Sequence, residues 1–468
     1  MENYTEYTGY ASLGLMGVWT IKKDIWGDMD QIKIPQKMIK YMPNDKLKDC
    51  FMNIMAGGHG IVEVNNLIRT DKGLQLCFGR SGCAEQSTIS ETLNACTEKN
   101  VDECRGALKQ IYQKNSYGYR HNYKAKCQVL DIDTSAMLAG KQAEGATKGY
   151  FSGHKNRRGR QLGRVIAYWY DEIVSEKLYS GTIQLEKNLI ELVKMAENVL
   201  DMNEKRRRHT IVRTDAGGGT DADINFSLGQ NYYLMSKMKN WQRTCKMVKT
   251  VTTWFPVPQL PDHECGWVGE PHQYVRPTRQ LAMRWPNKKK GGWKYCVLVF
   301  NLPNKLIFEL AGAPKPKKPK PVNLITTIIN AYDLRGGGIE TSLKNSKQGL
   351  GLNKRNKKLF HAQEMLVLIA QLAYNVVTWF QKELAANSKI IASFRTMRMI
   401  RDVFRISGML VFDAQNNLVM ITLNQSHKLA KPFCDTWKEY FARSKLSLNL
   451  GKIQVTGFNQ FTKPVRSS

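Results

Sequence analysis

The chain has 468 residues, and its 70 lysines and arginines against 40 aspartates and glutamates give a formal net charge of +30. This length accommodates two or three domains with buried cores, and the charge favours a polyanionic partner, most commonly nucleic acid. A membrane partner is not expected, because the sequence has no strongly apolar run of about 18 residues. The ten cysteines include no Cys-x2-Cys pair, which suits reduced thiols better than a disulfide framework or a zinc ribbon.

The first part of the chain, residues 1–125, is predicted to be a helical region that serves DNA binding or dimerisation. Apolar residues recur there at helical spacing between Leu47 and Met55. Further on, Ser87 is a candidate helix cap, and together with Thr88 it gives the next helix a hydroxyl-rich first turn. A short helix of this kind suits a DNA groove, and an ordinary surface helix is the alternative.

Residues 126–252 begin with a predicted short strand that ends in carboxylates. Asp131 and Asp133 share one face of this strand, because they are two residues apart. We favour Asp133 as the functional residue, since Thr134 follows it and the strand is expected to end there. An aspartate at a strand end is also common as a turn former or helix cap, so this residue alone is weak evidence.

A second aspartate follows another predicted strand. An amphipathic helix over residues 185–200 and a basic break lead into the strand Thr210–Arg213, which stops before Asp215. Asp221 and Asp223 compete with Asp215, but they are placed like the acidic first turn of a following helix. We expect that helix over residues 222–239 and a strand over residues 245–252.

Two further segments offer contacts to DNA. The basic loop between two predicted strands contains His154, Lys155 and Arg157, which suit either a DNA backbone contact or a solvated hairpin turn. Residues 253–321 form a predicted β-rich insertion and a basic, proline-rich linker. Trp293, which follows three lysines and two glycines, is our first choice for stacking on an unpaired base, although a tryptophan more often fills a small core.

The most informative segment lies in residues 322–390, which precede a mixed C-terminal region over residues 391–468. Glu340 is predicted at a helix start, with Lys344 at i+4 and Lys347 at i+7 on the same helical face. Tyr332 and Arg335 lie just upstream. A carboxylate held beside two cations is what a metal-dependent enzyme that grips a phosphate backbone requires, although a solvated cationic helix face is the alternative.

Asp133, Asp215 and Glu340 together suggest a metal site. Magnesium and manganese prefer such oxygen ligands, and two ions about 3.5–4 Å apart activate the attacking oxygen and stabilise the leaving oxygen in an in-line displacement.

With these residues in place, the chain resembles an insertion-sequence DDE transposase. The family's aspartate-threonine strand end is matched by Asp133 and Thr134, and its second aspartate by Asp215. Its Tyr-x2-Arg-x3-Glu-x6-Lys signature is matched by Tyr332, Arg335, Glu340 and Lys347, except that four residues instead of three separate Arg335 from Glu340. The resemblance implies an α/β fold: a ribonuclease-H-like mixed sheet flanked by helices, with a helical N-terminal domain and a β-rich insertion.

The resemblance also implies a function. Such an enzyme binds terminal repeats, cleaves DNA to free 3′ hydroxyls and joins them to target DNA, with two Mg²⁺ or Mn²⁺ ions held by Asp133, Asp215 and Glu340. Its partners are double-stranded DNA, both transposon ends and target, and a second copy of itself on DNA, in the cytoplasm of a prokaryote near the nucleoid. A nuclease that cuts without joining and an inactive, transposase-derived DNA-binding protein are the alternatives.

Overall fold

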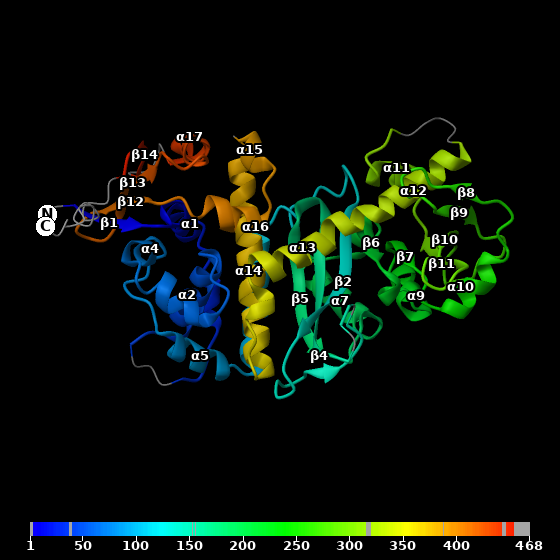
Figure 1. Ribbon diagram of the computed structural model, residues 1–468, viewed down its shortest axis with the longest axis horizontal. Coiled ribbons are helices and arrows are strands. Elements are labelled where there is room, and N and C mark those ends of the chain that lie inside the picture. Colours follow the sequence, from blue (N-terminus) through cyan, green and yellow to red (C-terminus); the bar gives the residue numbers. More distant parts are fainter. Residues whose placement is uncertain are drawn as a thin grey trace, which may run out of the picture. The chain divides into compact units, whose positions relative to one another are not determined.

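The computed structural model describes residues 3–36, 40–151, 153–154, 156–314, 320–386, 388–441 and 446–453 (Figure 1). The chain forms two compact units. The central unit comprises residues 108–344 and 356–371, and the terminal unit comprises residues 1–107, 345–355 and 372–468. The predicted α/β fold with mixed sheets is confirmed.

The central unit is built on one large mixed sheet, in the strand order β3-β4-β2-β6-β7-β11-β10-β9-β8, with β5 paired to β4. The parallel pairs are β2–β6 and β6–β7, whereas β2–β4 and β4–β5 are antiparallel. The strands are β2 (Gln128–Leu138), β3 (Thr147–Lys148), β4 (Arg158–Ala167), β5 (Glu172–Ser180), β6 (Thr210–Thr214), β7 (Tyr233–Lys237), β8 (Phe255–Pro256), β9 (Glu264–Trp267), β10 (Arg279–Pro286) and β11 (Trp293–Phe300).

The predicted β-rich insertion continues this same sheet. Strand β11 pairs antiparallel with β7, from Leu298 opposite Lys237 to Phe300 opposite Met235, and β10, β9 and β8 follow in turn. Backbone hydrogen bonds therefore connect the insertion directly to the strands that precede it.

Helices cover both faces of the sheet. Helix α12 (Pro321–Arg335) packs Ile325, Ile328 and Ile329 against apolar side chains of β2, β6, β7 and β11. On the other face α7 (Leu189–Leu200) packs at Gly163 of β4, where an added Cβ would lie 2.8 Å from Leu192. The remaining helices of this unit are the end of α6 (Glu98–Asn115), α8 (Glu204–Arg207), α9 (Asp221–Gly229), α10 (Trp241–Val248), α11 (Asn304–Leu310), α13 (Thr341–Lys344) and the first part of α14 (Phe360–Ala385).

The terminal unit combines the two ends of the chain in a four-stranded sheet, in the order β1 (Tyr4–Thr8), β12 (Gly408–Phe412), β13 (Leu418–Asn424) and β14 (Ser447–Gly451). Its core contains Trp437 stacked on Phe380 and Trp19 edge-on to the same ring. Its helices are α1 (Ala11–Lys22), α2 (Pro43–Met55), α3 (Val64–Leu67), α4 (Lys72–Cys77), α5 (Gln86–Asn94), most of α6 (Glu98–Asn115), the rest of α14, α15 (Lys389–Ala392), α16 (Thr396–Arg398) and α17 (Ala430–Phe441).

Three local predictions are wrong for identifiable reasons. The helix expected over residues 222–239 ends at Gly229, because Asn231 adopts a positive φ of 69° and the chain then enters β7. The strand expected over residues 245–252 is instead helix α10, which Asn240 caps by accepting a hydrogen bond from Arg243 N–H. Strand β2 does not end at Asp133, since its pairing with β4 continues to Leu138.

All ten cysteines are free, as the sequence indicates, and eight of them are buried. Within the described ranges, no helix has both the length and the apolarity needed to cross a membrane.

The turn after β6 depends on a glycine. A Cβ on Gly219 would lie 1.8 Å from the carbonyl oxygen of Lys237, so no side chain fits without moving β7. We expect Gly219→Ala to lower the free energy of unfolding by about 3 kcal/mol or more in urea titrations. Gly229→Ala is the matched control, because a Cβ there meets open space, and it should raise stability by up to about 1 kcal/mol. Equal stability of the two variants would contradict this account.

Candidate active site

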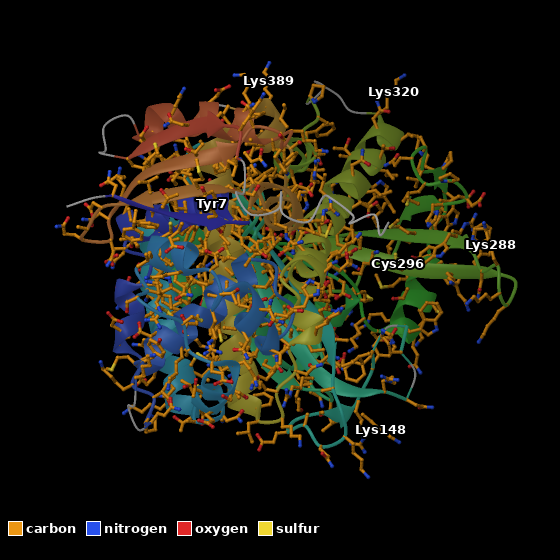
Figure 2. All side chains as sticks on the ribbon, turned by 60° about the vertical axis from the view of Figure 1, so that its left-hand side comes forward. Tyr7, Lys148, Lys288, Cys296, Lys320 and Lys389 are labelled. Atoms are coloured by element: carbon orange, nitrogen blue, oxygen red, sulfur yellow. The ribbon has the colours of Figure 1, made fainter. Side chains whose placement is uncertain are left out.

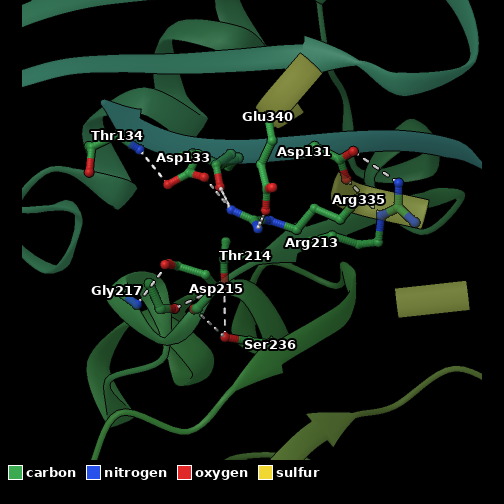
Figure 3. A network of polar contacts seen from close by, with 12 residues as sticks. Asp131, Asp133, Thr134, Arg213, Thr214, Asp215, Gly217, Ser236, Arg335 and Glu340 are labelled. Carbon is green, nitrogen blue, oxygen red and sulfur yellow. Dashed lines mark hydrogen bonds and ion pairs between the residues drawn. The ribbon is translucent and has the colours of Figure 1, made fainter. Parts of the chain in front are cut away.

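The parallel pairing of β2 with β6 places two carboxylates side by side. Asp131 lies opposite Arg213 in this pairing, so Asp133 and Asp215 occupy adjacent positions two residues further along both strands. Asp215 follows the last residue of β6, and its Oδ1 accepts a hydrogen bond of 2.8 Å from Gly217 N–H. The side chains of both aspartates are drawn in Figure 3.

Asp133 occupies an unfavourable electrostatic position. Burial raises the pKa of its carboxyl to about 6, and the negative charge of Asp215 acts in the same direction, while Arg335 opposes both. A carboxylate in such a position is stabilised by any cation brought beside it. Perturbed carboxyl groups of this kind cluster at functional sites.

Asp131 has a different role, although it shares the strand face with Asp133. Its side chain is fully buried, and both of its oxygens accept hydrogen bonds from Arg213, at 2.6 and 2.9 Å. Arg213 also donates to the carbonyl of Ala331 on α12 and lies over the ring of Tyr168. This buried pair therefore joins β2, β6 and α12.

Glu340 lies inside a long helical segment, so the prediction of a helix start at this residue is wrong. Helix α12 leads directly into a π turn over Gly336–Glu340 and then into α13. A π turn places residues i and i+5 on the same face of a helix. Arg335 and Glu340 are five residues apart, and their side chains accordingly meet, with Nη1 and Oε1 separated by 3.5 Å.

The π turn also accounts for the contact between Arg335 and Glu340, which four intervening residues separate. In an ordinary α-helix, a residue five positions after Arg335 would lie about 140° around the helix from it. The wider π turn instead returns Glu340 to the face of Arg335.

Arg335 lies between the carboxylates (Figure 3). Its Nη2 is 2.6 Å from Asp133 Oδ2, its Nη1 contacts Glu340, and its side chain is only 6% exposed. Burial lowers the pKa of Arg335, but the carboxylates of Asp133 and Asp215 outweigh this effect, so the guanidinium keeps its charge. Across the described part of the chain, no three His, Cys, Asp or Glu side chains converge closely enough to hold a metal ion by themselves.

Two contacts fix the helix that carries Glu340 against the sheet. Arg164, which is opposite Asp133 on β4, forms a buried ion pair with Glu176 and donates a hydrogen bond of 2.7 Å to Ser342 Oγ. Gly338 packs so tightly that a Cβ would lie 2.7 Å from the Tyr168 ring and 2.9 Å from Asp131 Oδ2.

Tyr332 lies inside the core. It is 5% exposed, and its hydroxyl donates a hydrogen bond of 3.0 Å to the carbonyl of Thr214, the residue before Asp215. Lys237 Nζ lies 5.0 Å from the centre of its ring. Tyr332 thus supports the end of β6, a role that was not predicted from the sequence.

The other predicted DNA-contacting residues of the central unit are spread over its surface. Lys344 is exposed on α13, and His154 and Arg157 are exposed in the loop before β4. Trp293 begins β11 and is 41% exposed, with the Arg284 guanidinium 4.6 Å from its ring centre. Lys155 lies outside the described residues.

Three predicted residues belong to the terminal unit. Lys347 is half-buried in a second π turn, Asn345–Gly349. Ser87 is exposed and Thr88 half-buried in the first turn of α5. Ser87 does not cap this helix, which begins at Gln86, and the hydroxyl of Thr88 instead donates to the carbonyl of Glu85.

Sequence reasoning also missed Arg213, Arg164 and Ser342, which hold the carboxylate-bearing elements together. Arg213 lies two residues before Asp215, and Asp131 lies two residues before Asp133. This matched spacing was the signal in the sequence for the pairing of Arg213 with Asp131. The pairing of Arg164 with Ser342 joins residues 178 positions apart and has no local signal.

The sequence matches the family described as Transposase DDE domain group 1 over residues 30–439. Among solved structures, the chain is similar to piggyBac transposase in a synaptic complex with hairpin DNA, with 9% sequence identity and a TM-score of 0.44. That similarity covers 86% of this chain and 83% of the other. No curated protein matches the chain significantly.

The distinct roles of the two β2 aspartates lead to a stability test. Asp131→Ala leaves Arg213 buried without its carboxylate, and we expect a loss of about 3–5 kcal/mol in the free energy of unfolding. Asp133→Ala should cost clearly less, because burial already penalises the Asp133 carboxylate and Arg335 keeps its contact with Glu340. Urea titrations at pH 7 measure both variants, and a larger loss for Asp133→Ala would show that the roles are reversed.

Proposed function

Because the chain belongs to the DDE transposase family, we propose that it is the DNA transposase of an insertion sequence. In this proposal it binds the terminal repeats, cleaves phosphodiester bonds to free 3′ hydroxyls, and joins those hydroxyls to target DNA. The observation that carries the proposal is the adjacent placement of Asp133 and Asp215 at neighbouring positions of two parallel strands, with Glu340 tied to Asp133 through Arg335.

The donor set fits divalent metal ions. Asp133 and Asp215 offer hard oxygen ligands of the type that Mg²⁺ and Mn²⁺ prefer. Burial and the neighbouring charge of Asp215 keep the pKa of Asp133 raised even though Arg335 contacts it, so a further cation at this position would be favourable. Glu340 is the proposed third ligand, and its side chain is 64% exposed. When bound, two such ions supply activation of the attacking oxygen and stabilisation of the leaving oxygen.

The chain's own cations have separate proposed tasks. Arg335 keeps Asp133 and Glu340 oriented toward each other, because its guanidinium contacts both carboxylates. Lys344 is exposed one turn beyond Glu340, where its ammonium can bind a phosphate of the DNA next to the cleaved bond. Lys347 is proposed for the same task, and Tyr332 supports the strand end at Asp215.

The working form that we propose is a homodimer on double-stranded DNA, because joining requires two transposon ends to be brought together. The proposed setting is the cytoplasm of a prokaryote, near the nucleoid.

Strand joining tests the carboxylate assignment directly. We expect Asp215→Ala to abolish cleavage and joining of DNA that carries the flanking terminal repeats, in reactions with magnesium resolved on denaturing gels. Asp221→Ala is the matched control, since Asp221 begins α9 and pairs with Arg243, and it should retain activity. Normal joining by Asp215→Ala would refute the site, whereas cleavage without joining by the parent protein would favour a nuclease.

Metal binding should weaken in acid. The Asp133 carboxyl has a pKa of about 6, so it is protonated below that pH and must lose its proton before it binds a cation. A ligand that binds only the folded state stabilises it. We therefore expect Mn²⁺ to raise the melting temperature at pH 7.5 and to raise it much less at pH 5.

The control for this experiment is Asp133→Asn, which removes the titrating carboxyl. This variant should show a small Mn²⁺ effect at both pH values. An equal rise in melting temperature for the parent protein at pH 7.5 and pH 5 would contradict the role of Asp133.

A further inference from the structure

Among the residues that the structure describes, one buried arginine of the central unit has no carboxylate partner, unlike its neighbours. Arg164, Arg213 and Arg335 each form an ion pair with a buried aspartate or glutamate. Arg160 is only 1% exposed, yet its guanidinium donates to three backbone carbonyls: Glu144 at 2.6 Å, Lys357 at 3.0 Å and Lys358 at 2.9 Å. An arginine keeps its charge under such conditions, so this positive charge is left without a neutralising ion pair.

Arg160 joins two segments that are far apart in the sequence. The first is residues 139–160, which contain β3 and the start of β4, and the second is residues 356–360, which lead into α14. Two further hydrogen bonds connect them: Glu144 N–H donates to the Lys358 carbonyl at 2.9 Å, and Phe360 N–H donates to Glu144 Oε2 at 2.7 Å. These hydrogen bonds therefore hold the described parts of the two segments side by side in one surface.

This Arg160 surface is strongly basic. Residues 139–160 contain six lysines and arginines, and residues 356–360 contain two. Glu144 is the single acidic residue of both segments. The carboxylate of Glu144 is already engaged by Phe360 N–H. Its exposed side chains include Lys141, Lys148, Tyr150, His154, Arg157 and Lys358, and Figure 2 shows Lys148 at the outer edge of the ribbon.

The Arg160 surface lies at a defined distance from the candidate active site. In the β2–β4 pairing, Arg160 is opposite Met137 and Arg164 is opposite Asp133. Four residues of strand span about 13 Å at roughly 3.3 Å per residue. Because successive base pairs of duplex DNA are about 3.4 Å apart, this distance corresponds to roughly four base pairs.

We propose that the Arg160 surface binds the phosphate backbone of the duplex DNA whose phosphodiester bond lies at Asp133 and Asp215. Lys148 and Lys358 provide charge-assisted contacts to phosphate oxygens, and such contacts fix the position of a duplex without reading its bases. Arg160 is a positioning residue, because it holds the Lys358 segment next to β3 and β4. The inference rests on the proposed function, which supplies the DNA.

Salt dependence of binding tests this surface. Removing one lysine that binds a phosphate should reduce the slope of log K against log salt by about 0.9 for duplex DNA. The double variant Lys148→Gln/Lys358→Gln should therefore show a slope smaller by about 1.8 than the parent. The measurement is fluorescence anisotropy of a labelled terminal-repeat duplex between 50 and 300 mM KCl, with EDTA to prevent cleavage.

Two further variants complete the design. Lys431→Gln is the matched control: Lys431 is an exposed lysine of the terminal unit that pairs with Asp435 at 2.6 Å, and its removal should leave the parent slope. Arg160→Lys keeps the charge but lacks the planar fork whose three nitrogens reach the three separate carbonyls. This variant should therefore reduce the slope, while a thermal melt shows that the chain is folded.

The outcomes separate the two claims. If the parent protein binds no duplex, the proposed function fails and the inference fails with it. If the parent binds and the double variant keeps the parent slope, only the inference is overturned. The inference would also be overturned if Lys431→Gln reduced the slope as much as the double variant does. The reduction would then reflect the net charge of the protein alone.

Discussion

The parallel pairing of β2 with β6 is the constraint on which the candidate site depends. It brings Asp133 next to Asp215 and, two residues earlier, Asp131 next to Arg213. The first pair concentrates like charge, which burial makes more costly, and the second forms a neutralised, fully buried ion pair. The register of the β2–β6 pairing therefore places Asp133 beside Asp215 at the strand ends. The same register forms the Asp131–Arg213 ion pair, which joins both strands to α12.

The helix that carries Glu340 solves a related problem of register. The Glu340 side chain contacts Arg335, so both residues must lie on one face of a helical segment that also buries Tyr332. The π turn over Gly336–Glu340 accomplishes this, and Gly338 permits the close approach to Tyr168 and Asp131. Gly337, by contrast, faces open space. Of these glycines, Gly338 is therefore required by close packing, whereas the surroundings of Gly337 leave room for a side chain.

Much of the central fold follows from local patterns. The helix α7 and the strand before Asp215 both have the predicted type, because the apolar pattern of α7 is long and the strand ends at a clear polar residue. The end of β2 was not predictable in this way, since its continuation to Leu138 depends on pairing with β4. The π turn was also hidden, because composition does not distinguish it from an α-helix. For the site, sequence spacing indicated the three acids and Arg335, but the roles of Arg164 and Arg213 became visible only through contacts between distant elements.

The continuity of the sheet through the insertion has a mechanical consequence. The hairpin of β10 and β11 ends in the lysines before Trp293, and β11 joins β7, then β6, then β2 by unbroken strand pairing. Three strand spacings of about 4.8 Å separate β11 from β2. A displacement of β11 would therefore have to break ladder hydrogen bonds or move β7, β6 and β2 with it, so the position of the insertion is coupled to the strand that bears Asp133.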